Sequence, residues 1–291
     1  MHDKTPPRGV LALLDKHTAV EIAAYVGRLE ALGYDSFWIP ELFGREPFIT
    51  AAYLLARTDR IALATGIANI YVRDAHAIAQ SCHTLAELYE GRFILGVGVS
   101  NVELTGARGH AWQPPLAKMK GYLAALAGIK VQSAAPATSA PLILAAHGPQ
   151  LQRLGAACCN GILTYLMSVE HTRRSRERIG PAAQLNVVCA VLAEADAVVA
   201  RRIARSALTA YLKLDYYQRE WRKLGYTEAD FEHGGSDALI DMLVGWGDKS
   251  ALEARLSAHV AAGATRVIVM PLDPAPTELE MKTLQLLSPT A

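Results

Sequence analysis

Apolar positions along the chain fall into short runs, and these runs alternate with longer segments of helical periodicity. Several runs are apolar at both odd and even positions, which indicates strands that are covered on both faces and therefore paired in parallel. Eight such runs occur, at residues 10–14, 36–40, 61–70, 92–99, 141–146, 162–167, 185–192 and 266–272. Eight βα units favour a closed barrel over an open sheet, because a barrel has no edge strand. We therefore predict an α/β fold, a single (β/α)8 TIM-barrel domain over residues 1–291.

Polar residues at the expected helix starts support this alternation. Thr18 with Glu21, and Ser250 with Glu253, each have the spacing of a capping box. The stretches "LEALGYDSFWI", "LGAACCNGILTYL" and "VAAGATRVIVM" each run from a helix end through glycine into a strand, which indicates a repeated αβ unit.

Two longer segments interrupt the repeat, at about residues 101–117 after the fourth strand and at about 215–247 between the seventh and eighth strands. The first follows "FILGVGVSN", where a dinucleotide-binding fingerprint would need a third glycine that opens a helix, and Asn101 stands there instead. We therefore expect an irregular loop over residues 102–115 and no Rossmann turn. Long segments of this kind usually serve as lids, binding loops or contacts between subunits.

Charge and hydropathy exclude several classes of partner. Lys and Arg total 29 against 28 for Asp and Glu, so no long-range field attracts nucleic acid or anionic lipid. The N-terminus lacks the apolar region of a signal peptide, and prolines break the longest uncharged stretches before they reach the length of a membrane span. We expect a cytoplasmic protein with no nucleic-acid or membrane partner.

Cysteine, histidine and acidic residues show no pattern typical of a metal site or of nucleophilic catalysis. No His, Asp or Glu spacing indicates metal ligands, and a G-x-S-x-G motif is absent, so we expect neither a metal centre nor a nucleophilic hydrolase. Free buried thiols are the expected state of the cysteines, which lack C-x-x-C spacing. They are Cys82, Cys158, Cys159 and Cys189.

In a barrel of this kind the functional site lies at the carboxyl ends of the strands. Two residues there are candidates for acid–base chemistry, Glu41 after the second strand and His147 after the fifth. Glu41 could instead pair with Arg45, and His147 could be a turn residue near a helix start. The other strand-end groups, which offer hydroxyls, amides or close backbone approach to a ligand, are Thr65, Gly66, Ile67, Asn69, Gly98, Ser100, Asn101, Ala146, Gly148, Pro149, Thr164 and Tyr165.

The loops that follow the strands differ in their ability to bind an anion. The segments "AEADAVV" and "DPAPTE" after the seventh and eighth strands are acidic and lack glycine, although many barrels bind phosphate there. Glycine, serine and asparagine cluster after the fourth and fifth strands instead. A phosphate at these loops would be held by backbone N–H groups and neutral side chains.

Five stretches together resemble the luciferase-like monooxygenase family, in particular its branch of coenzyme F420-dependent oxidoreductases. They are "LGYDSFWIPELFGREPF", "RIALATGIANIYVRD", "LAELYEGRFILGVGVS", "GHAWQPPLAKMKGYL" and "VAAGATRVIVMPL". The resemblance implies a TIM barrel that binds a deazaflavin or flavin, with the ring over the barrel top and the phosphate near the loops after strands four and five. The strand-end residues named above, His147 among them, are then cofactor-binding residues. A non-proline cis peptide is expected at Gly66–Ile67, behind the ring.

One position departs from the pattern of the F420-dependent relatives. Several of them carry a histidine directly after the acidic residue that ends strand two, whereas this chain has Leu42 after Glu41. If that histidine acts as an acid or base, Glu41 or His147 would have to replace it here.

Three functions remain open from the sequence. The first is hydride transfer between F420 and a small organic substrate. The second is an FMN-dependent monooxygenase that uses reduced FMN and oxygen, and the third is a flavin-binding protein without turnover. A homodimer that forms through barrel helices is also expected, since the small-residue helix "AIAQSCHTLAELY" is compatible with an interface.

Overall fold

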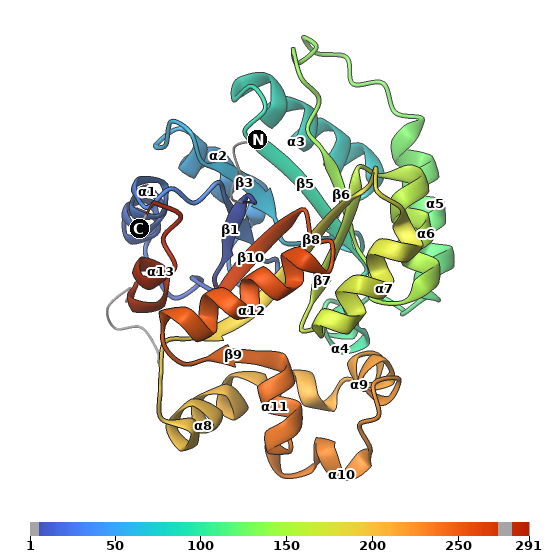
Figure 1. The fold of residues 1–291 in the computed structure, drawn as a ribbon. Helices are drawn as coiled ribbons and strands as arrows, with labels where there is room; N and C mark the ends of the chain where they lie inside the picture. Colours follow the sequence, from blue (N-terminus) through green and yellow to red (C-terminus); the bar gives the residue numbers. More distant parts are fainter. Residues whose placement is uncertain (1–5, 273–280, 291) are drawn as a thin grey trace.

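The computed structural model describes residues 6–272 and 281–290 and has a barrel of parallel strands inside a ring of helices (Figure 1). The barrel strands are β1 (Arg8–Leu11), β2 (Ser36–Ile39), β3 (Ala62–Thr65), β5 (Phe93–Gly98), β6 (Leu142–Ala145), β7 (Gly161–Tyr165), β8 (Gln184–Leu192) and β10 (Arg266–Pro271). They pair in the order β10-β1-β2-β3-β5-β6-β7-β8, and a further pairing of β10 with β8 closes the ring. The predicted TIM barrel is confirmed, because each apolar run overlaps one of these strands.

Two short strands add to the ring. β4 (Ala68–Asn69) continues β3 after a bulge and pairs with the end of β5, where Asn69 lies opposite Gly98. β9 (Val244–Trp246) pairs in parallel with the last residues of β8. The run at residues 61–70, which the sequence predicts as one strand, is therefore two strands.

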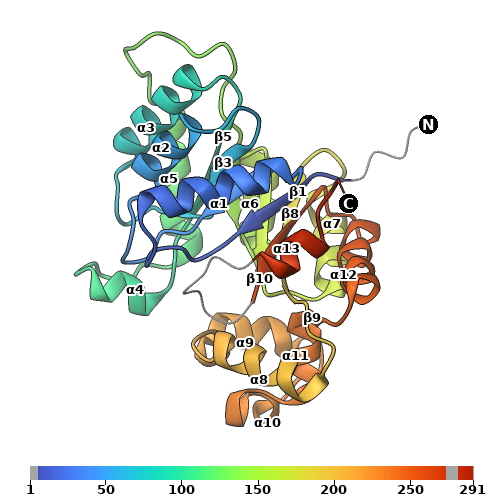
Figure 2. The ribbon, with the colours of Figure 1, turned by 90° about the vertical axis from the view of Figure 1, so that its left-hand side faces the viewer.

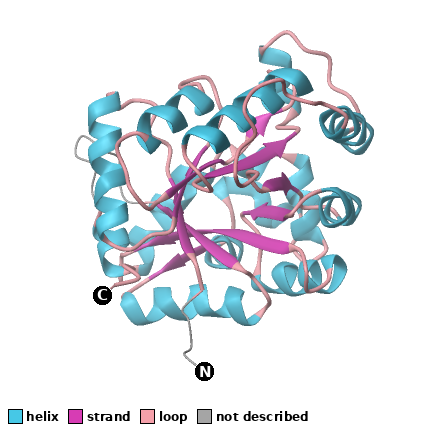
Figure 3. Ribbon diagram, turned by 90° about the horizontal axis from the view of Figure 1, so that it is seen from above, coloured by secondary structure: helices cyan, strands magenta, loops and turns pink. Residues whose placement is uncertain are grey.

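Helices cover the outer face of the barrel, as the view along the strands in Figure 3 shows. They are α1 (Ala19–Ala31), α2 (Pro47–Leu55), α3 (Ala75–Leu88), α5 (Pro115–Ala127), α6 (Pro149–Cys158), α7 (Val169–Ile179), α12 (Lys249–Ala261) and α13 (Lys282–Leu286). An apolar core lies between these helices and the outward-facing strand residues, among them Leu63, Phe93 and Val187.

One of the two expected capping boxes is present. Thr18 and Glu21 exchange hydrogen bonds at the start of α1, with the Thr18 N–H donating to the Glu21 carboxylate at 2.7 Å. The box at Ser250 was wrong, because α12 begins earlier. Asp248 is its N-cap and accepts a hydrogen bond from the Ala251 N–H at 2.9 Å.

The segment after β5 begins with a helix, α4 (Val102–Ala107), and the expectation of an irregular loop there was wrong. Asn101, at the position of the missing glycine, is the N-cap of α4 and accepts a hydrogen bond from the Leu104 N–H at 2.8 Å. A short polar side chain of this kind is a favourable helix start, which explains why the chain turns into a helix here.

A second group of helices lies at the carboxyl end of the barrel, and Figures 1 and 2 show it as a layer beneath the strands. Its members are α8 (Ala197–Leu208), the 3-10 turn η1 (Tyr211–Lys213), α9 (Asp215–Arg222), α10 (Glu228–Phe231), the 3-10 turn η2 (Glu232–Gly234) and α11 (Asp237–Leu243). We call residues 197–243 the helical insertion. It begins with α8, earlier than the sequence boundary at about residue 215.

The helical insertion shares an apolar core with the barrel interior. Trp38 and Ile143, which fill the barrel, belong to the same cluster of buried side chains as Tyr217, Trp221 and Leu239 of the insertion. The insertion is therefore packed onto the mouth of the barrel by apolar contact and does not stand apart from it.

The four cysteines are free. Cys189 is buried, and burial raises its pKa to about 11. Cys82 and Cys159 are only partly buried and Cys158 is exposed, so the expectation of buried thiols was wrong for Cys158 and holds fully only for Cys189. The acidic segment "DPAPTE" after the eighth strand lies within residues 273–280, outside the described part of the chain.

Candidate active site

The bulge between β3 and β4 contains the expected cis peptide, Gly66–Ile67. The Thr65 hydroxyl bridges this bulge to the neighbouring strand, since it donates to the Gly96 carbonyl at 2.6 Å and accepts from the Gly96 N–H at 2.9 Å. The hydroxyl thus takes over the role of backbone pairing where the bulge interrupts it.

The glycine pair of "FILGVGVSN" makes room for this bulge. A Cβ atom at Gly96 would lie 2.1 Å from the Thr65 carbonyl oxygen, and one at Gly98 would lie 2.9 Å from Ile67 Cδ1. No side chain fits at either position without a shift of the bulge. Close approach of two strands therefore explains both glycines.

Glu41 follows β2 and holds the other side of the bulge. Its side chain is 4% exposed, Oε1 accepts from Arg73 Nη1 at 2.6 Å, and Oε2 accepts from the Asn69 N–H at 2.8 Å. Arg73 also pairs with Glu46. The alternative of a pair with Arg45 was wrong, because that guanidinium donates to the His17 carbonyl at 2.6 Å. Both oxygens of Glu41 are thus engaged by the protein.

The remaining candidates around β4 and β5 have local structural partners. Asn69 is buried, and its Oδ1 accepts from the Tyr71 N–H at 2.9 Å. Asn101 caps α4, as described above, and Ser100 has a φ of 62°, in the left-handed region. Asn101 also contacts the helical insertion: burial raises the pKa of Tyr216 to about 12, and hydrogen bonds with Tyr217 and Asn101 counter that shift.

The loop after β6 leads directly into α6. Gly148 is the N-cap of α6 and provides no side chain to bond its first N–H groups, and Pro149 begins the helix. Ala146 is buried, and its N–H donates to the Leu163 carbonyl at 3.0 Å. Such an uncapped helix start is a favourable place for an anion, because N–H groups and the helix dipole both favour negative charge there.

His147 is held between this loop and the helical insertion. Its carbonyl accepts from Gln152 Nε2 at 2.9 Å and from His171 Nε2 at 3.0 Å. Its ring lies 5.2 Å from the ring of Tyr217 and 6.3 Å from that of Tyr216, between ring centroids. Burial and the nearby His171 hold its pKa down at about 3, so the ring is neutral at physiological pH.

Two buried polar atoms near the ends of adjacent strands have no hydrogen-bond partner within the described residues. They are Nδ1 of His147, after β6, and Oγ1 of Thr164, in β7. Buried polar groups are normally satisfied, because leaving one without a partner costs about 1–3 kcal/mol. Thr164 pairs with Val187 and, like it, faces the outer helices, whereas the His147 ring lies against Tyr216 and Tyr217 at the mouth. A ligand with a polar group would satisfy His147 Nδ1, so this residue fits a cofactor at the mouth.

Tyrosines from the barrel and the insertion meet beside the His147 ring. The Tyr165 hydroxyl donates to Met270 Sδ at 3.1 Å, and its ring lies 5.3 Å from that of Tyr211. Burial raises the pKa of Tyr165 well above its ordinary value, so the phenol stays protonated. We call this set the tyrosine cluster. Its members are Tyr165, Tyr211, Tyr216 and Tyr217.

Sequence reasoning missed the insertion's part of this cluster. From the sequence, the segment "LDYYQREW" is only part of the interruption at about residues 215–247. Tyr217 and Trp221 are four positions apart and therefore share one face of a helix, next to Tyr216. This spacing was the signal from which an aromatic helix face could have been predicted. Which part of the barrel that face would contact depends on tertiary packing.

Two kinds of feature are absent from residues 6–272 and 281–290. These residues include no group of three or more His, Cys, Asp or Glu side chains that could hold a metal ion. Nor do they form any helix that is long and apolar enough to cross a membrane.

Comparison with known proteins identifies relatives over most of the chain. Residues 5–266 match the profile of the luciferase-like monooxygenase family. A protein of Mycobacterium tuberculosis that carries the name of a coenzyme F420-dependent oxidoreductase is 24% identical over 315 aligned residues, which cover 85% of this chain and 89% of that protein. A 5,10-methylenetetrahydromethanopterin reductase of Methanolobus tindarius is 32% identical over 161 residues, and that match spans about half of each protein, 50% of this chain and 49% of the reductase.

Solved structures share the fold. The coenzyme F420-dependent tetrahydromethanopterin reductase of Methanopyrus kandleri superimposes with a TM-score of 0.71 at 16% identity and covers 98% of this chain and 97% of its own. The oxygenating constituent of 3,6-diketocamphane monooxygenase from Pseudomonas putida, solved in complex with FMN, gives a TM-score of 0.67 at 14% identity, with 98% and 97% coverage. One barrel architecture therefore serves proteins with different cofactors.

Proposed function

Because the chain belongs to the luciferase-like monooxygenase family, we propose that it is an oxidoreductase that transfers a hydride between coenzyme F420 and a small organic substrate. The observation that carries this proposal is the unpartnered polar atom His147 Nδ1, which lies beside the uncapped start of α6. Relatives named for F420 support the choice of cofactor.

The residues of the mouth divide into two groups in this proposal. The loop of Ala146–Pro149 would hold the phosphate side of the cofactor through backbone N–H groups and neutral side chains, and Tyr165 would border it at the end of β7. The bulge side would support the ring and consists of Thr65, Gly66, Ile67, Asn69, Gly98, Ser100 and Asn101. When bound, the cofactor supplies the hydride chemistry, and the chain orients it and excludes water.

We assign different tasks to the two acid–base candidates. Both oxygens of Glu41 are bonded to Arg73 and the Asn69 N–H, so this carboxylate serves as a positioning residue that fixes the bulge. His147 is neutral, and its Nδ1 has no partner in the described chain, so it is free to form a hydrogen bond with a ligand. His147 would thereby take the role of the histidine that relatives carry at the position of Leu42.

The second candidate is an FMN-dependent monooxygenase. Leu42 at the position of the expected histidine favours it, together with the likeness to a fold relative solved with FMN. A flavin-binding protein without turnover is the third possibility, and it too is suggested by Leu42.

Equilibrium titration of the purified protein with F420 and, separately, with FMN tests the proposal by fluorescence quenching or calorimetry. We expect F420 to bind at least about tenfold more tightly than FMN, a difference of about 1.4 kcal/mol. The reverse order would favour the monooxygenase. If neither cofactor binds, the proposed function is wrong.

We also propose that the protein forms a homodimer in the cytoplasm through α3. This helix is rich in small residues, and Leu88 at its end is 57% exposed. Light scattering coupled to gel filtration measures the mass directly. A monomeric mass at micromolar concentration would refute the dimer, and Leu88→Lys should shift a dimer toward monomer.

A further inference from the structure

Tyr165 is the last residue of β7, and its side chain points into the barrel. Along β7, Leu163 belongs to the apolar cluster of the barrel interior and Tyr165 packs against it, whereas Ile162 belongs to the outer core. The Tyr165 hydroxyl donates to Sδ of Met270, on β10, at 3.1 Å. Because β8 lies between β7 and β10, the phenol reaches past one strand and across part of the barrel mouth.

The hydrogen bond to Met270 leaves the Tyr165 hydroxyl available to a ligand. A thioether sulfur is a weak acceptor, so an oxygen atom in the same place would be a stronger partner. The Tyr165 side chain is half-buried and is therefore within reach of a small molecule at the mouth. Burial, followed by the neighbouring Tyr211, raises its pKa well above the ordinary value, so the phenol keeps its proton and acts as a donor.

The helical insertion completes an aromatic wall around this hydroxyl. Between centroids, the ring of Tyr165 lies 5.3 Å from that of Tyr211 and 6.3 Å from that of Tyr217. The rings of Tyr216 and Tyr217 are 4.4 Å apart. The charged group that acts on Tyr216 is a carboxylate, that of Glu103 in α4. The wall thus offers aromatic faces and hydroxyl groups, and the one charge found beside it is negative.

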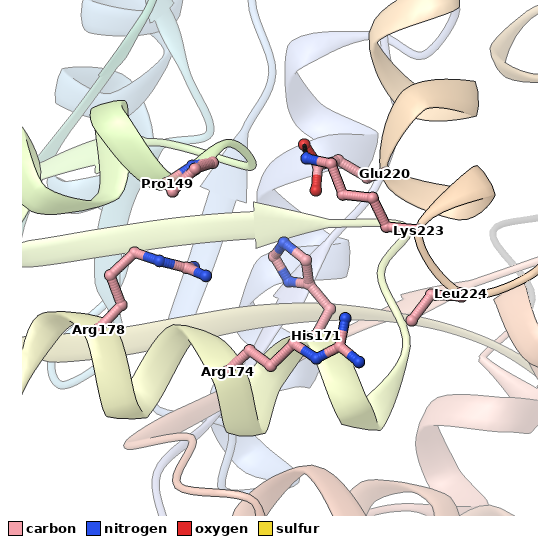
Figure 4. A pocket seen from close by; sticks show the side chains of 7 residues that line it. All are labelled: Pro149, His171, Arg174, Arg178, Glu220, Lys223 and Leu224. Atoms are coloured by element: carbon pink, nitrogen blue, oxygen red, sulfur yellow. Dashed lines mark hydrogen bonds and ion pairs between the residues drawn. The ribbon is translucent and has the colours of Figure 1, made fainter.

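The charged side chains of α9 line a different space. Glu220 and Lys223 form an ion pair of 2.6 Å and line a cavity of about 270 Å³ that α9 shares with α6 and α7 (Figure 4). Trp221, next to Glu220 in the sequence, is fully buried and stacks on Tyr217 with 5.5 Å between the ring centroids. α9 therefore turns its ion pair toward α6 and α7 and its aromatic side chains toward the barrel mouth.

A wall of this composition favours one class of small molecule. An ionised group that is buried against aromatic rings loses its hydration, and the contacts of the four tyrosines include no cation that would compensate for this loss. An apolar body gains contact with the ring faces. A single uncharged oxygen atom would accept the hydrogen bond of the Tyr165 hydroxyl.

We propose that the tyrosine cluster is the substrate-binding wall of the mouth, and that the Tyr165 hydroxyl donates a hydrogen bond to the oxygen of an uncharged, mainly apolar carbonyl compound or alcohol. The inference rests on the proposed function, because it identifies the oxygen-bearing carbon as the one that exchanges the hydride. Carboxylates and phosphate esters are excluded as substrates. Tyr165 is then the residue that determines this specificity, and it acts by binding the oxygen and not by giving up its proton.

Three probes of similar shape test the wall in the purified full-length protein. They are acetophenone, which has an uncharged carbonyl, ethylbenzene, which has the same skeleton without oxygen, and benzoate, which is charged. Ligand-observed NMR titration measures their dissociation constants, without cofactor and with saturating F420 or FMN. We expect acetophenone to bind about fivefold more tightly than ethylbenzene, the value of one hydrogen bond, and at least about tenfold more tightly than benzoate.

The Tyr165→Phe variant removes the hydroxyl and keeps the ring. It should weaken acetophenone binding by about fivefold and leave ethylbenzene binding unchanged, so that the difference between these probes disappears. Tyr53→Phe is the matched control, because Tyr53 lies on α2, where its ring packs under the Arg57 guanidinium. This variant should bind all three probes as the wild type does.

A second substitution changes the same hydrogen bond in the opposite direction. Met270→Leu removes the sulfur that competes for the Tyr165 hydroxyl and keeps a side chain of similar volume. It should increase the preference for acetophenone over ethylbenzene, and it reports on the site even if Tyr165→Phe is too unstable to measure. The proposal is overturned if the wild type binds benzoate as tightly as acetophenone, if the probe preference is unchanged in the stable variants, or if no probe binds in any state.

The cofactor titrations separate this inference from the proposed function. If the probes discriminate as expected but neither F420 nor FMN binds, the wall is supported and the redox function is refuted. If a cofactor binds but the three probes bind equally well, the redox function stands and the assignment of the wall is wrong.

Discussion

Gly96 lies where β5 passes closest to the bulge that separates β3 from β4. The backbone carbonyl of Thr65 fills the space that a side chain would need there. The Thr65 hydroxyl donates a hydrogen bond to the Gly96 carbonyl and accepts one from the Gly96 N–H. Glu41 and Arg73 hold the opposite side of the same bulge. The shape of the barrel mouth near β4 therefore depends on a few residues whose contacts are with backbone atoms.

Gly96→Ala should destabilise the fold by about 3 kcal/mol or more, because the added Cβ would clash with the Thr65 backbone carbonyl and a rotamer change cannot relieve that clash. Gly106→Ala is the control, since a Cβ there meets nothing within 4 Å and α4 gains a better helix former. Urea denaturation measures both. A Gly96→Ala variant as stable as the wild type would contradict the account of the bulge.

The elements themselves were well predicted where one local signal decides them. Apolar runs located the barrel strands because both faces of a parallel strand are buried. The cap of α12 was misplaced because Ser250 and Asp248 are both residue types that cap helices well, and the local pattern does not choose between them. The contact of Tyr217 with His147 could not be predicted, because it depends on how the helical insertion packs.

The position of the α12 cap gives a direct test. Asp248→Ala should cost about 1 kcal/mol of stability, because it removes the acceptor for the Ala251 N–H. Ser250→Ala should change stability by less than about 0.5 kcal/mol, since Ser250 is exposed inside the first turn. The thermal denaturation midpoints of the two variants can be compared in one experiment. A larger loss of stability in Ser250→Ala than in Asp248→Ala would show that Ser250 caps α12, as the sequence predicts.

α7 and α12 meet at a buried histidine that makes stability depend on pH. His259 Nδ1 lies 2.9 Å from Thr172 Oγ1, and burial, with smaller contributions from Arg255 and His171, holds the His259 pKa at about 4. In the unfolded chain this histidine titrates near 6.5. The unfolded state therefore binds more protons between these values, and the stability falls as the pH drops from about 6.5 to 4.

We expect this loss to reach as much as about 3 kcal/mol from His259 alone at pH 4. His259→Gln should flatten the dependence of unfolding free energy on pH, whereas His76→Gln, at an exposed position, should leave the slope as it is. Urea denaturation at several pH values measures the slope. An unchanged slope in His259→Gln would show that other groups carry the dependence.

At the scale of the whole molecule, the barrel and the helical insertion share one apolar core. Trp38 inside the barrel and Trp221 in the insertion are both fully buried, and the Trp221 Nε1 donates to the Leu166 carbonyl at the end of β7 at 3.1 Å. Core side chains that contact each other across two parts of a chain lose their contacts together. The barrel and insertion should therefore unfold as one unit.

Coincident transitions in guanidinium test this expectation. The Trp112→Phe variant removes a partly exposed tryptophan, so that the fluorescence comes mainly from buried ones. We expect its fluorescence midpoint to agree with the midpoint from circular dichroism within about 0.2 M. Two separated transitions would mean that the insertion unfolds on its own.

β9 has a practical consequence for anyone who exchanges helical insertions between relatives. It pairs with β8 at three positions, Ala190 with Val244, Val191 with Gly245 and Leu192 with Trp246, so the insertion returns to the barrel as part of its wall. A graft cut only at the ends of α9 and α11 would leave β9 behind. The transplanted helices would then lack the strand whose pairing with β8 fixes their position on the barrel. The natural unit of exchange runs from the end of β8 to the start of α12.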